Sequence, residues 1–161
     1  RPPNLYPKEN PISETKIQLR PKLQPRSSLN LCFDKGRKTK KNGQTIWIPR
    51  NWYEVERTTK KEEHTKDYPR GELKAWVKDN GSVYELDMIT SGGDVPKKRI
   101  KGYKDIMTRE REVLGELIKG KLHRQGHLEE NDPVTLEVLQ NYGRDYISLK
   151  KIRDKVYFLE F

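Results

Sequence analysis

Two runs of alternating hydrophobic and polar residues lie in the middle of the chain. They occupy residues 72–78 and 83–89 and flank the turn sequence Asp79-Asn80-Gly81. Alternation places every second side chain on one face of an extended chain, and Asn-Gly is a strong turn signal, so a β-hairpin is predicted. The same criteria predict four further strands, at residues 16–19, 44–49, 146–152 and 156–161.

Hydrophobic residues at helical spacing follow this hairpin. They predict one amphipathic helix over residues 109–121, with Thr108 as its N-cap, and a shorter helix from Asp132 to Gly143, with Pro133 at its first helical position. The hydrophobic face of the first helix consists of Val113, Leu114, Leu117, Ile118 and Leu122. Six or seven strands and two short helices indicate a mainly β fold, a partly open barrel with helices at its ends.

Proline is concentrated at the start of the chain, where residues 1–28 hold six of the ten prolines. We therefore expect a proline-rich linker at residues 1–15 and one domain at residues 16–161. Residues 27–42 are polar and basic and end in Asn42-Gly43, which predicts a long exposed loop or ribbon. Charged or glycine-rich loops are expected at residues 56–70 and 90–104.

The composition restricts the possible functions. The chain has 161 residues, of which 34 are Lys or Arg and 24 are Asp or Glu, giving a net charge of +10. Such an excess predicts an acidic partner, most often a phosphate backbone. A hydrophobic content of 32% without a long apolar run excludes membrane spans. The single cysteine excludes a disulfide framework, and the three histidines argue against a metal centre, so no cofactor is expected. We expect a piece of a larger cytoplasmic, bacterial protein.

The basic residues form two clusters in predicted loops. Five cations lie within residues 35–41 and five within residues 97–104. Lysines of this kind are suited to phosphates, whereas Arg, Asn, Gln and Asp side chains can bind base edges. Each cluster taken alone is also compatible with a solvated surface loop. Two clusters with interleaved Gly, Asn and Gln favour two arms that hold a duplex.

Two short motifs raise the alternative of a nuclease. His64-Thr65-Lys66 matches the H-x-K of phospholipase-D-like nucleases, but Gly71 stands where that motif requires Asp. Asp67 with Glu72-Leu73-Lys74 resembles the metal-binding carboxylates and lysine of restriction nucleases, at too short a spacing. We therefore predict no catalytic residue and no metal ligand in this chain. A nuclease active by itself and an RNA-binding module remain the alternatives.

Several short motifs along the chain are shared, in order, with a known family. They are Leu29-Asn30, Gly36-Arg37, Gln44, Ile48-Pro49, Asp79-Asn80-Gly81, Leu114-Gly115-Glu116, Tyr142-Gly143-Arg144 and Tyr157-Phe158-Leu159-Glu160-Phe161. Over residues 16–161 the chain resembles the C-terminal region of the NgoFVII-type restriction endonucleases, to which NgoAVII and BfiI are related. In that family this region is a B3-like DNA-binding pseudobarrel, attached to an N-terminal, phospholipase-D-like and metal-independent nuclease domain.

This resemblance implies a site-recognition domain that holds the major groove of double-stranded DNA with two arms. The matching positions are residues 28–44 and 90–104. We expect a monomeric, non-catalytic domain that serves the nuclease domain of its parent chain. Because Arg pairs with guanine and Asp accepts from cytosine, a short, asymmetric, G/C-rich site is favoured.

The candidate DNA contacts divide by chemistry. The base-reading candidates are Asn30, Asp34, Arg37, Asn42 and Gln44 on the first arm and Ser91, Asp94, Lys97 and Arg99 on the second. The phosphate candidates are Lys35, Lys38, Lys40, Lys41, Lys98, Lys101 and Lys104.

Overall fold

The computed structural model describes residues 5–23 and 28–161, which fold into two compact units. The first unit contains the described residues of Arg1–Gln18, Thr58–Arg109 and Tyr146–Phe161. The second contains those of Leu19–Arg57 and Glu110–Asp145. Residues 1–4 of the predicted linker and residue 27 of the predicted loop lie outside the described residues.

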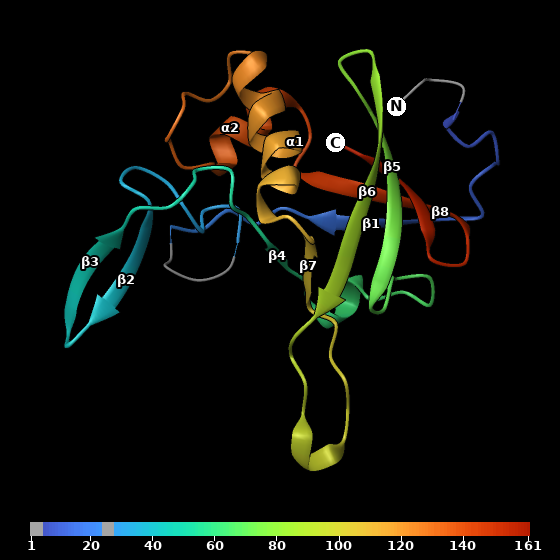
Figure 1. The fold of residues 1–161 in the computed structure, drawn as a ribbon, viewed down its shortest axis with the longest axis horizontal. Helices are drawn as coiled ribbons and strands as arrows, with labels where there is room; N and C mark the ends of the chain where they lie inside the picture. Colours follow the sequence, from blue (N-terminus) through green and yellow to red (C-terminus); the bar gives the residue numbers. More distant parts are fainter. Residues whose placement is uncertain (1–4, 24–27) are drawn as a thin grey trace. The chain divides into compact units, whose positions relative to one another are not determined.

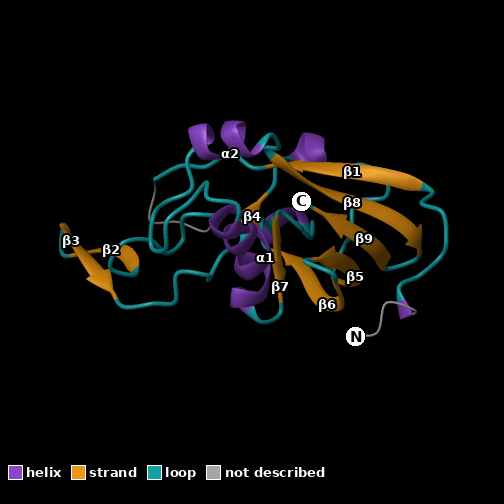
Figure 2. Cartoon of the chain, turned by 90° about the horizontal axis from the view of Figure 1, so that it is seen from above, coloured by secondary structure: helices purple, strands orange, loops and turns teal. Residues whose placement is uncertain are grey.

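A seven-stranded sheet dominates the first unit (Figures 1 and 2). Its strand order is β1-β8-β9-β5-β6-β7-β4. Strands β5 and β9 pair in parallel. The pairs β1–β8, β8–β9, β5–β6 and β6–β7 are antiparallel. The strands are β1 (Ser13–Gln18), β4 (Arg57–Thr58), β5 (Glu72–Asp79), β6 (Ser82–Ser91), β7 (Asp105–Thr108), β8 (Tyr146–Arg153) and β9 (Val156–Glu160). The sheet curls into a half-barrel, which confirms the predicted mainly β pseudobarrel with two helices.

The predicted central hairpin is β5–β6. Its turn residues Asn80 and Gly81 both have positive φ, 51° and 79°, as a two-residue type I′ turn requires. Alternation buries Leu73, Ala75 and Val77 on the inner face of β5. The burial of these apolar side chains against the rest of the sheet therefore fixes the register of the hairpin.

The second unit is built around helix α1 (Arg111–Arg124), with α2 (Leu136–Tyr142) and a separate hairpin of β2 (Arg37–Lys41) and β3 (Gln44–Ile48). Leu114, Ile118 and Leu122 are fully buried on one side of α1, as their spacing predicts. A Cβ at Gly115 would lie 1.7 Å from the Tyr53 carbonyl oxygen, so only glycine permits this approach to the helix. None of the helices in the described ranges is long and apolar enough to cross a membrane.

The structure corrects both predicted helix starts. Thr108 does not cap α1, because it is the last residue of β7 and pairs with Met88 of β6. Glu110 occupies the N-cap position of α1. Pairing at the sheet thus outweighs the local capping preference. Pro133 lies before α2, whose N-cap is Thr135 with its hydroxyl accepting a hydrogen bond from the Val138 amide.

Two other boundaries also differ from the sequence expectations. Strand β1 starts at Ser13, so Ser13–Thr15 pair with β8 instead of belonging to the linker. The segment 56–70, expected to be loop, contains β4 and a short 3-10 helix (Lys61–Glu63). Strand β4 and this 3-10 helix are brief, and their polar sequences give no periodic signal.

Candidate nucleic-acid interface

The first basic cluster forms a regular β-ribbon. We call residues 33–48 arm 1. Strands β2 and β3 pair from Arg37 opposite Ile48 to Lys41 opposite Gln44, and Asn42-Gly43 closes them with φ values of 52° and 77°. The ribbon projects from the body of its unit (Figure 1). The predicted loop or ribbon is therefore a ribbon from residue 37 onward, whereas residues 29–32 are buried in the unit.

The pairing of arm 1 gives it two chemically different faces. Cross-strand partners share a face, and alternate residues along a strand point to opposite faces. We call one side the Trp47 face. There the Trp47 ring packs edge-on against the Phe33 ring, with 5.4 Å between the ring centroids. The Lys38 ammonium lies 6.0 Å from the centroid of the Trp47 ring. The opposite side, the Arg37 face, carries Arg37, Thr39, Lys41, Gln44, Ile46 and Ile48. The Arg37 face thus combines hydrogen-bonding and apolar side chains.

A buried lysine holds the base of arm 1. The Lys119 ammonium on α1 has no solvent exposure and donates to the carbonyl oxygens of Cys32 and Trp52, at 2.9 and 2.6 Å. Cys32 precedes the ribbon and Trp52 follows it, so one side chain ties both ends. Burial lowers the Lys119 pKa to about 7. A Cβ at Gly36 would lie 2.2 Å from the Ile48 carbonyl oxygen, so glycine permits the close approach of the strands there.

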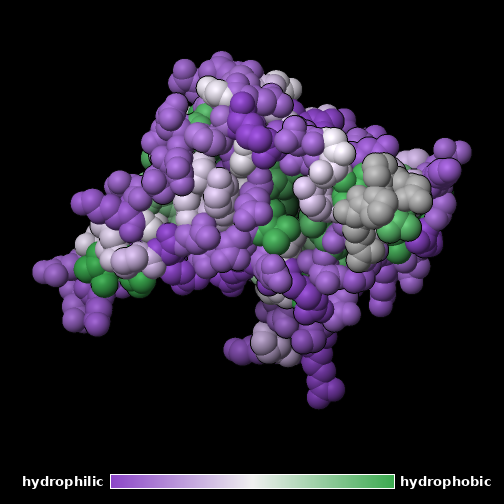
Figure 3. Space-filling model, turned by 45° about the horizontal axis from the view of Figure 1, so that its top comes forward, coloured by the Kyte–Doolittle hydropathy of each residue, from purple (hydrophilic) through white to green (hydrophobic). Residues whose placement is uncertain are grey.

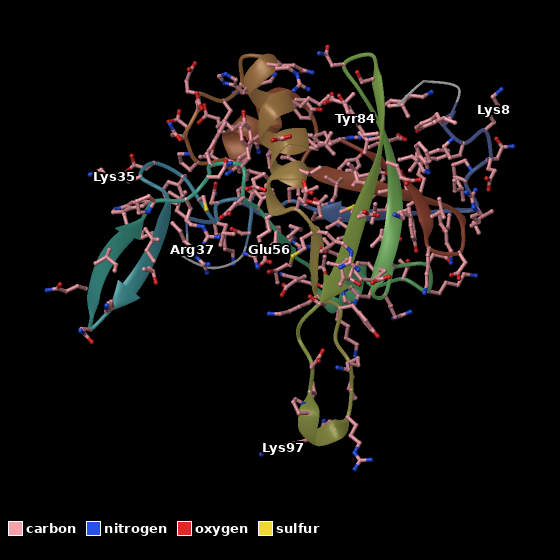
Figure 4. The ribbon with its side chains drawn as sticks, in the orientation of Figure 1. Lys8, Lys35, Arg37, Glu56, Tyr84 and Lys97 are labelled. Atoms are coloured by element: carbon pink, nitrogen blue, oxygen red, sulfur yellow. The ribbon has the colours of Figure 1, made fainter. Side chains whose placement is uncertain are left out.

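The second basic cluster forms an irregular projection. We call residues 91–104 arm 2. Val95 and Ile100 exchange backbone hydrogen bonds below a tip made by a 3-10 helix (Pro96–Lys98) and Arg99, whose φ is 51°. Because a Cβ at Gly102 would lie 2.4 Å from the carbonyl oxygens of Gly92 and Gly93, the two sides cross at glycines. Figure 4 shows Lys97 at the tip of this arm.

An acidic side chain braces arm 2 from within. The Asp94 carboxylate accepts hydrogen bonds from the Gly102 amide at 3.0 Å and from the Lys101 ammonium at 3.2 Å. The hydrogen bond from the Gly102 amide lowers the pKa of Asp94, and the nearby Lys101 ammonium lowers it further. Both Asp94 and Lys101 are therefore already engaged within the arm.

A hydroxyl network anchors the base of arm 2. The Thr59 hydroxyl donates to the Lys104 carbonyl oxygen at 2.8 Å, and the Tyr68 hydroxyl donates to the Tyr103 carbonyl oxygen at 2.8 Å. His64 stacks on Tyr68 at 4.0 Å, and its Nε2 lies 2.6 Å from the Thr59 hydroxyl. Burial, with a contribution from Arg70, lowers the His64 pKa. His64, the histidine of the H-x-K motif, is therefore a packing residue of this anchor.

Comparison with known protein families identifies the chain. Residues 8–153 match the family described as NgoFVII C-terminal B3-like DNA-binding domain. The chain belongs to this family. The predicted family is thus confirmed, and DNA is the partner that a B3-like DNA-binding domain implies. No curated protein matches the chain.

One predicted base contact has a different role in this B3-like domain. Asn30 is only 1% exposed, and its side-chain amide donates to the Val134 carbonyl oxygen while its oxygen accepts from the Val134 amide, at 2.8 and 2.7 Å. These bonds satisfy the buried amide inside the second unit. We therefore remove Asn30 from the proposed base-reading set. The other candidates on the two arms are exposed, except Arg37, which is half-buried: Asp34, Asn42, Gln44, Ser91, Asp94, Lys97 and Arg99.

The phosphate candidates all lie on the two arms. Lys38 is half-buried beside Trp47. The others are exposed, and they are Lys35, Lys40, Lys41, Lys98, Lys101 and Lys104. Within the described ranges, only Lys101 of these lysines forms an ion pair, with Asp94. Arm 1 therefore presents its ammonium groups without a carboxylate partner among the described residues.

The acidic residues and the lysine of the restriction-nuclease-like motif form ion pairs with other side chains in this B3-like domain. Glu72 pairs with Arg109, Lys74 pairs with Asp87, and Asp67 lies 3.4 Å from the Lys151 ammonium. The described part of the chain contains no group of three His, Cys, Asp or Glu residues suited to a metal ion. The arrangement of these side chains gives no support to a metal-dependent nuclease.

Sequence reasoning missed the anchors and the apolar part of arm 1. Lys119 and Thr59 gave no recognisable motif, because their roles depend on backbone carbonyls that are distant in sequence. The positions of Ile46 and Ile48 were recoverable, since the Asn42-Gly43 turn fixes the register and the register fixes the faces.

Proposed function

We propose that this domain recognises a short, asymmetric, G/C-rich site in the major groove of double-stranded DNA for a restriction endonuclease. The nuclease activity would belong to a phospholipase-D-like domain elsewhere in the parent chain, and the domain itself would act as a monomer. The observation that carries the proposal is the two-faced ribbon of arm 1. It places the half-buried Arg37 and the exposed Gln44 on one face of the ribbon, whose base is anchored by Lys119.

The dimensions and chemistry of arm 1 support major-groove binding. A two-stranded β-ribbon fits the major groove, where each base pair presents a distinct pattern of donors and acceptors. The Arg37 guanidinium has no hydrogen bond or ion pair to another described residue, so its donors are available to O6 and N7 of guanine. Gln44 can bind adenine in the same bidentate manner.

Arm 2 supports the proposal as a second source of phosphate contacts. Its tip carries Lys97, Lys98 and Arg99, which lie next to each other on the 3-10 helix and its C-cap. Phosphate contacts fix the position of a protein on the duplex without specifying sequence. We therefore assign Lys98 at the tip to phosphate positioning, and Lys97 and Arg99 beside it remain proposed base contacts.

Selection of bound oligonucleotides from a random duplex pool tests the proposal. The expected result is one short asymmetric consensus, bound more tightly than random duplex and than RNA of the same sequence. Enrichment without a consensus, or equal binding of RNA, would contradict site-specific DNA recognition.

A cleavage assay tests the separation of recognition from catalysis. Plasmid DNA incubated with this chain should stay intact with and without magnesium. Reproducible nicking that disappears in Glu72→Gln or Lys74→Met would show that the domain is a nuclease by itself.

A further inference from the structure

Two isoleucines are exposed on the Arg37 face of arm 1. Ile46 is 37% exposed and lies opposite Thr39, and Ile48 is 43% exposed and lies opposite Arg37. Figure 3 shows hydrophobic surface on this ribbon amid hydrophilic surface. By contrast, the chain buries Ile17, Ile106, Ile118, Ile147 and Ile152. The two isoleucines of β3 therefore contribute less to the core than to the surface of the arm.

The surroundings of these isoleucines point to DNA as their occupant. The face that holds them also carries Arg37 and Lys41, and the ribbon has no carboxylate between residues 37 and 48. A surface of this kind repels a basic protein partner and attracts phosphates. In the major groove, the apolar feature of the base edges is the C5-methyl group of thymine.

The spacing of the isoleucines fits successive bases. Alternate residues of a strand lie about 6.7 Å apart, and stacked base pairs lie about 3.4 Å apart. Ile46 and Ile48 therefore span about two base steps along a groove. Arg37, opposite Ile48, and Gln44, two residues before Ile46, would then bind base edges beside them.

We propose that Ile46 and Ile48 of arm 1 read thymine C5-methyl groups. The recognised site then contains thymine at the base position that faces Ile46, at the one that faces Ile48, or at both. The inference rests on the proposed recognition of duplex DNA. It adds an apolar component to the site, so Arg37 accounts for guanine and the isoleucines for thymine.

Replacement of thymine by uracil tests this inference on the wild-type protein. Uracil pairs like thymine and lacks only the methyl group. Each thymine of the selected duplex is replaced in turn, and the dissociation constant is measured. Because burial of one CH₂-sized group is worth about 0.8 kcal/mol, the wild type should bind about fourfold more weakly for each methyl that is read.

Matched variants assign the methyl to a residue. For each methyl that is read, the Ile→Ala change at the isoleucine that reads it, Ile46→Ala or Ile48→Ala, should weaken binding to the thymine duplex and abolish the response to uracil at that position. The control Ile12→Ala makes the same change at an isoleucine that lies outside the arms and is 69% exposed. This variant should retain the wild-type response to uracil. Arg37→Ala should also retain the response to uracil while losing discrimination at guanine.

The outcomes separate this inference from the proposed function. A consensus without thymine, or a wild-type protein indifferent to uracil at every position, would overturn methyl reading and leave DNA recognition standing. Sensitivity to uracil at one and the same position that survives in both isoleucine variants would also overturn it. Failure of the wild type to distinguish selected from random duplex would contradict the proposed function and the inference together.

Discussion

The two arms of this domain carry similar charge on different frameworks. Arm 1 is a hydrogen-bonded ribbon whose register sorts its side chains onto two faces, and its base is tied by Lys119. Arm 2 is an irregular projection in which glycines allow the chain to cross, and its base is held by Thr59 and Tyr68. In arm 2, Asp94 already engages its own arm's groups.

A basic cluster in a sequence therefore does not by itself define a contact surface. On arm 1, alternation places Lys38 and Lys40 on the face opposite Arg37 and Gln44, so two of its phosphate candidates are separated from its base-reading residues, whereas Lys41 shares the Arg37 face. Arm 2 offers no such separation, because its cations surround a tip of about one helical turn. We therefore expect arm 1 to carry more of the specificity.

The largest expected effect is that of salt on DNA binding by both arms. If about six phosphates are neutralised, log K should fall with log salt with a slope of about −5. Affinity should then drop about a thousandfold between roughly 50 and 200 mM salt. Isothermal titration calorimetry or fluorescence titration at several salt concentrations measures this slope. An affinity that does not change with salt would rule out phosphate binding by these arms.

Removal of charge from one arm at a time measures the share of phosphate binding that each arm contributes. The arm 1 variant replaces Lys38, Lys40 and Lys41 with Gln and should reduce the slope by roughly three. The arm 2 variant replaces Lys98, Lys101 and Lys104 and should reduce it less, because Asp94 already pairs with Lys101. Replacement of the exposed Lys8, Lys22 and Lys61, which lie outside the arms, should leave the slope unchanged.

The second expected effect concerns the anchor of arm 1. The Lys119 pKa is about 7 in the folded protein and 10.5 ordinarily, so between these values the unfolded state binds more protons and folding stability rises with pH. From pH 7 to about 9.5, the wild type should gain about 3 kcal/mol relative to Lys119→Met. Urea unfolding at each pH measures the difference.

A matched lysine controls for general effects of pH. Lys22→Met changes an exposed lysine of the same unit and should retain the wild-type rise in stability. If Lys119→Met showed that rise as well, Lys119 would not be the group responsible. The anchor of arm 2 contains no buried lysine among its described groups, so its own variant, Thr59→Val, should destabilise the protein without removing this pH dependence.

Much of the fold could be predicted because the motifs that carry the family resemblance fix the backbone. Asn30 bonds twice to Val134, Gly36 allows the Ile48 carbonyl to approach, and Gly115 allows Tyr53 to approach α1. Gly143 ends α2 with a φ of 97°. These residues specify the architecture, so their pattern identifies the family.

The same property explains why the roles of the residues in the basic segments are harder to predict. An amide in a basic segment has the right chemistry for a base contact, so the sequence predicts one at Asn30, but it does not show that residues 29–32 are buried. Alternation predicts the faces of arm 1 once the turn is known, whereas arm 2 has no period to exploit. Its crossing at Gly102 depends on contacts with residues 92 and 93 that no local pattern reveals.

The third expected effect tests base reading on arm 1. Arg37→Ala should lose about 1–3 kcal/mol on the selected site and much less on random duplex, because a guanidinium that binds guanine O6 and N7 adds sequence-dependent energy. Arg37→Lys keeps the charge but lacks the planar fork, so it should still lose most of the discrimination. Competition titrations with selected and random duplexes measure both losses.

The alternative for Arg37 is an ordinary phosphate contact. In that case Arg37→Ala would weaken selected and random duplexes equally, and Arg37→Lys would restore binding. The comparison between the arms would then shift, since Gln44 or the residues of arm 2 would have to supply discrimination. Arg99→Ala is the corresponding change at the tip of arm 2, and we expect it to cost less specificity than Arg37→Ala because its position on the tip is exposed and irregular.

The smallest expected effect distinguishes positioning from reading at single lysines. Lys40→Ala and Lys101→Ala should each weaken selected and random duplexes to about the same extent, because phosphate contacts carry no sequence information. The loss should be roughly 0.5–1 kcal/mol for Lys40, whose exposed ammonium would pair with a phosphate. It should be smaller for Lys101, whose ammonium already lies 3.2 Å from Asp94. In an Asp94→Ala background Lys101 loses that internal partner, so Lys101→Ala should then cost as much as Lys40→Ala. A change in the preferred base at any position in either lysine variant would show that the lysine reads sequence and that the division of labour on its arm is wrong.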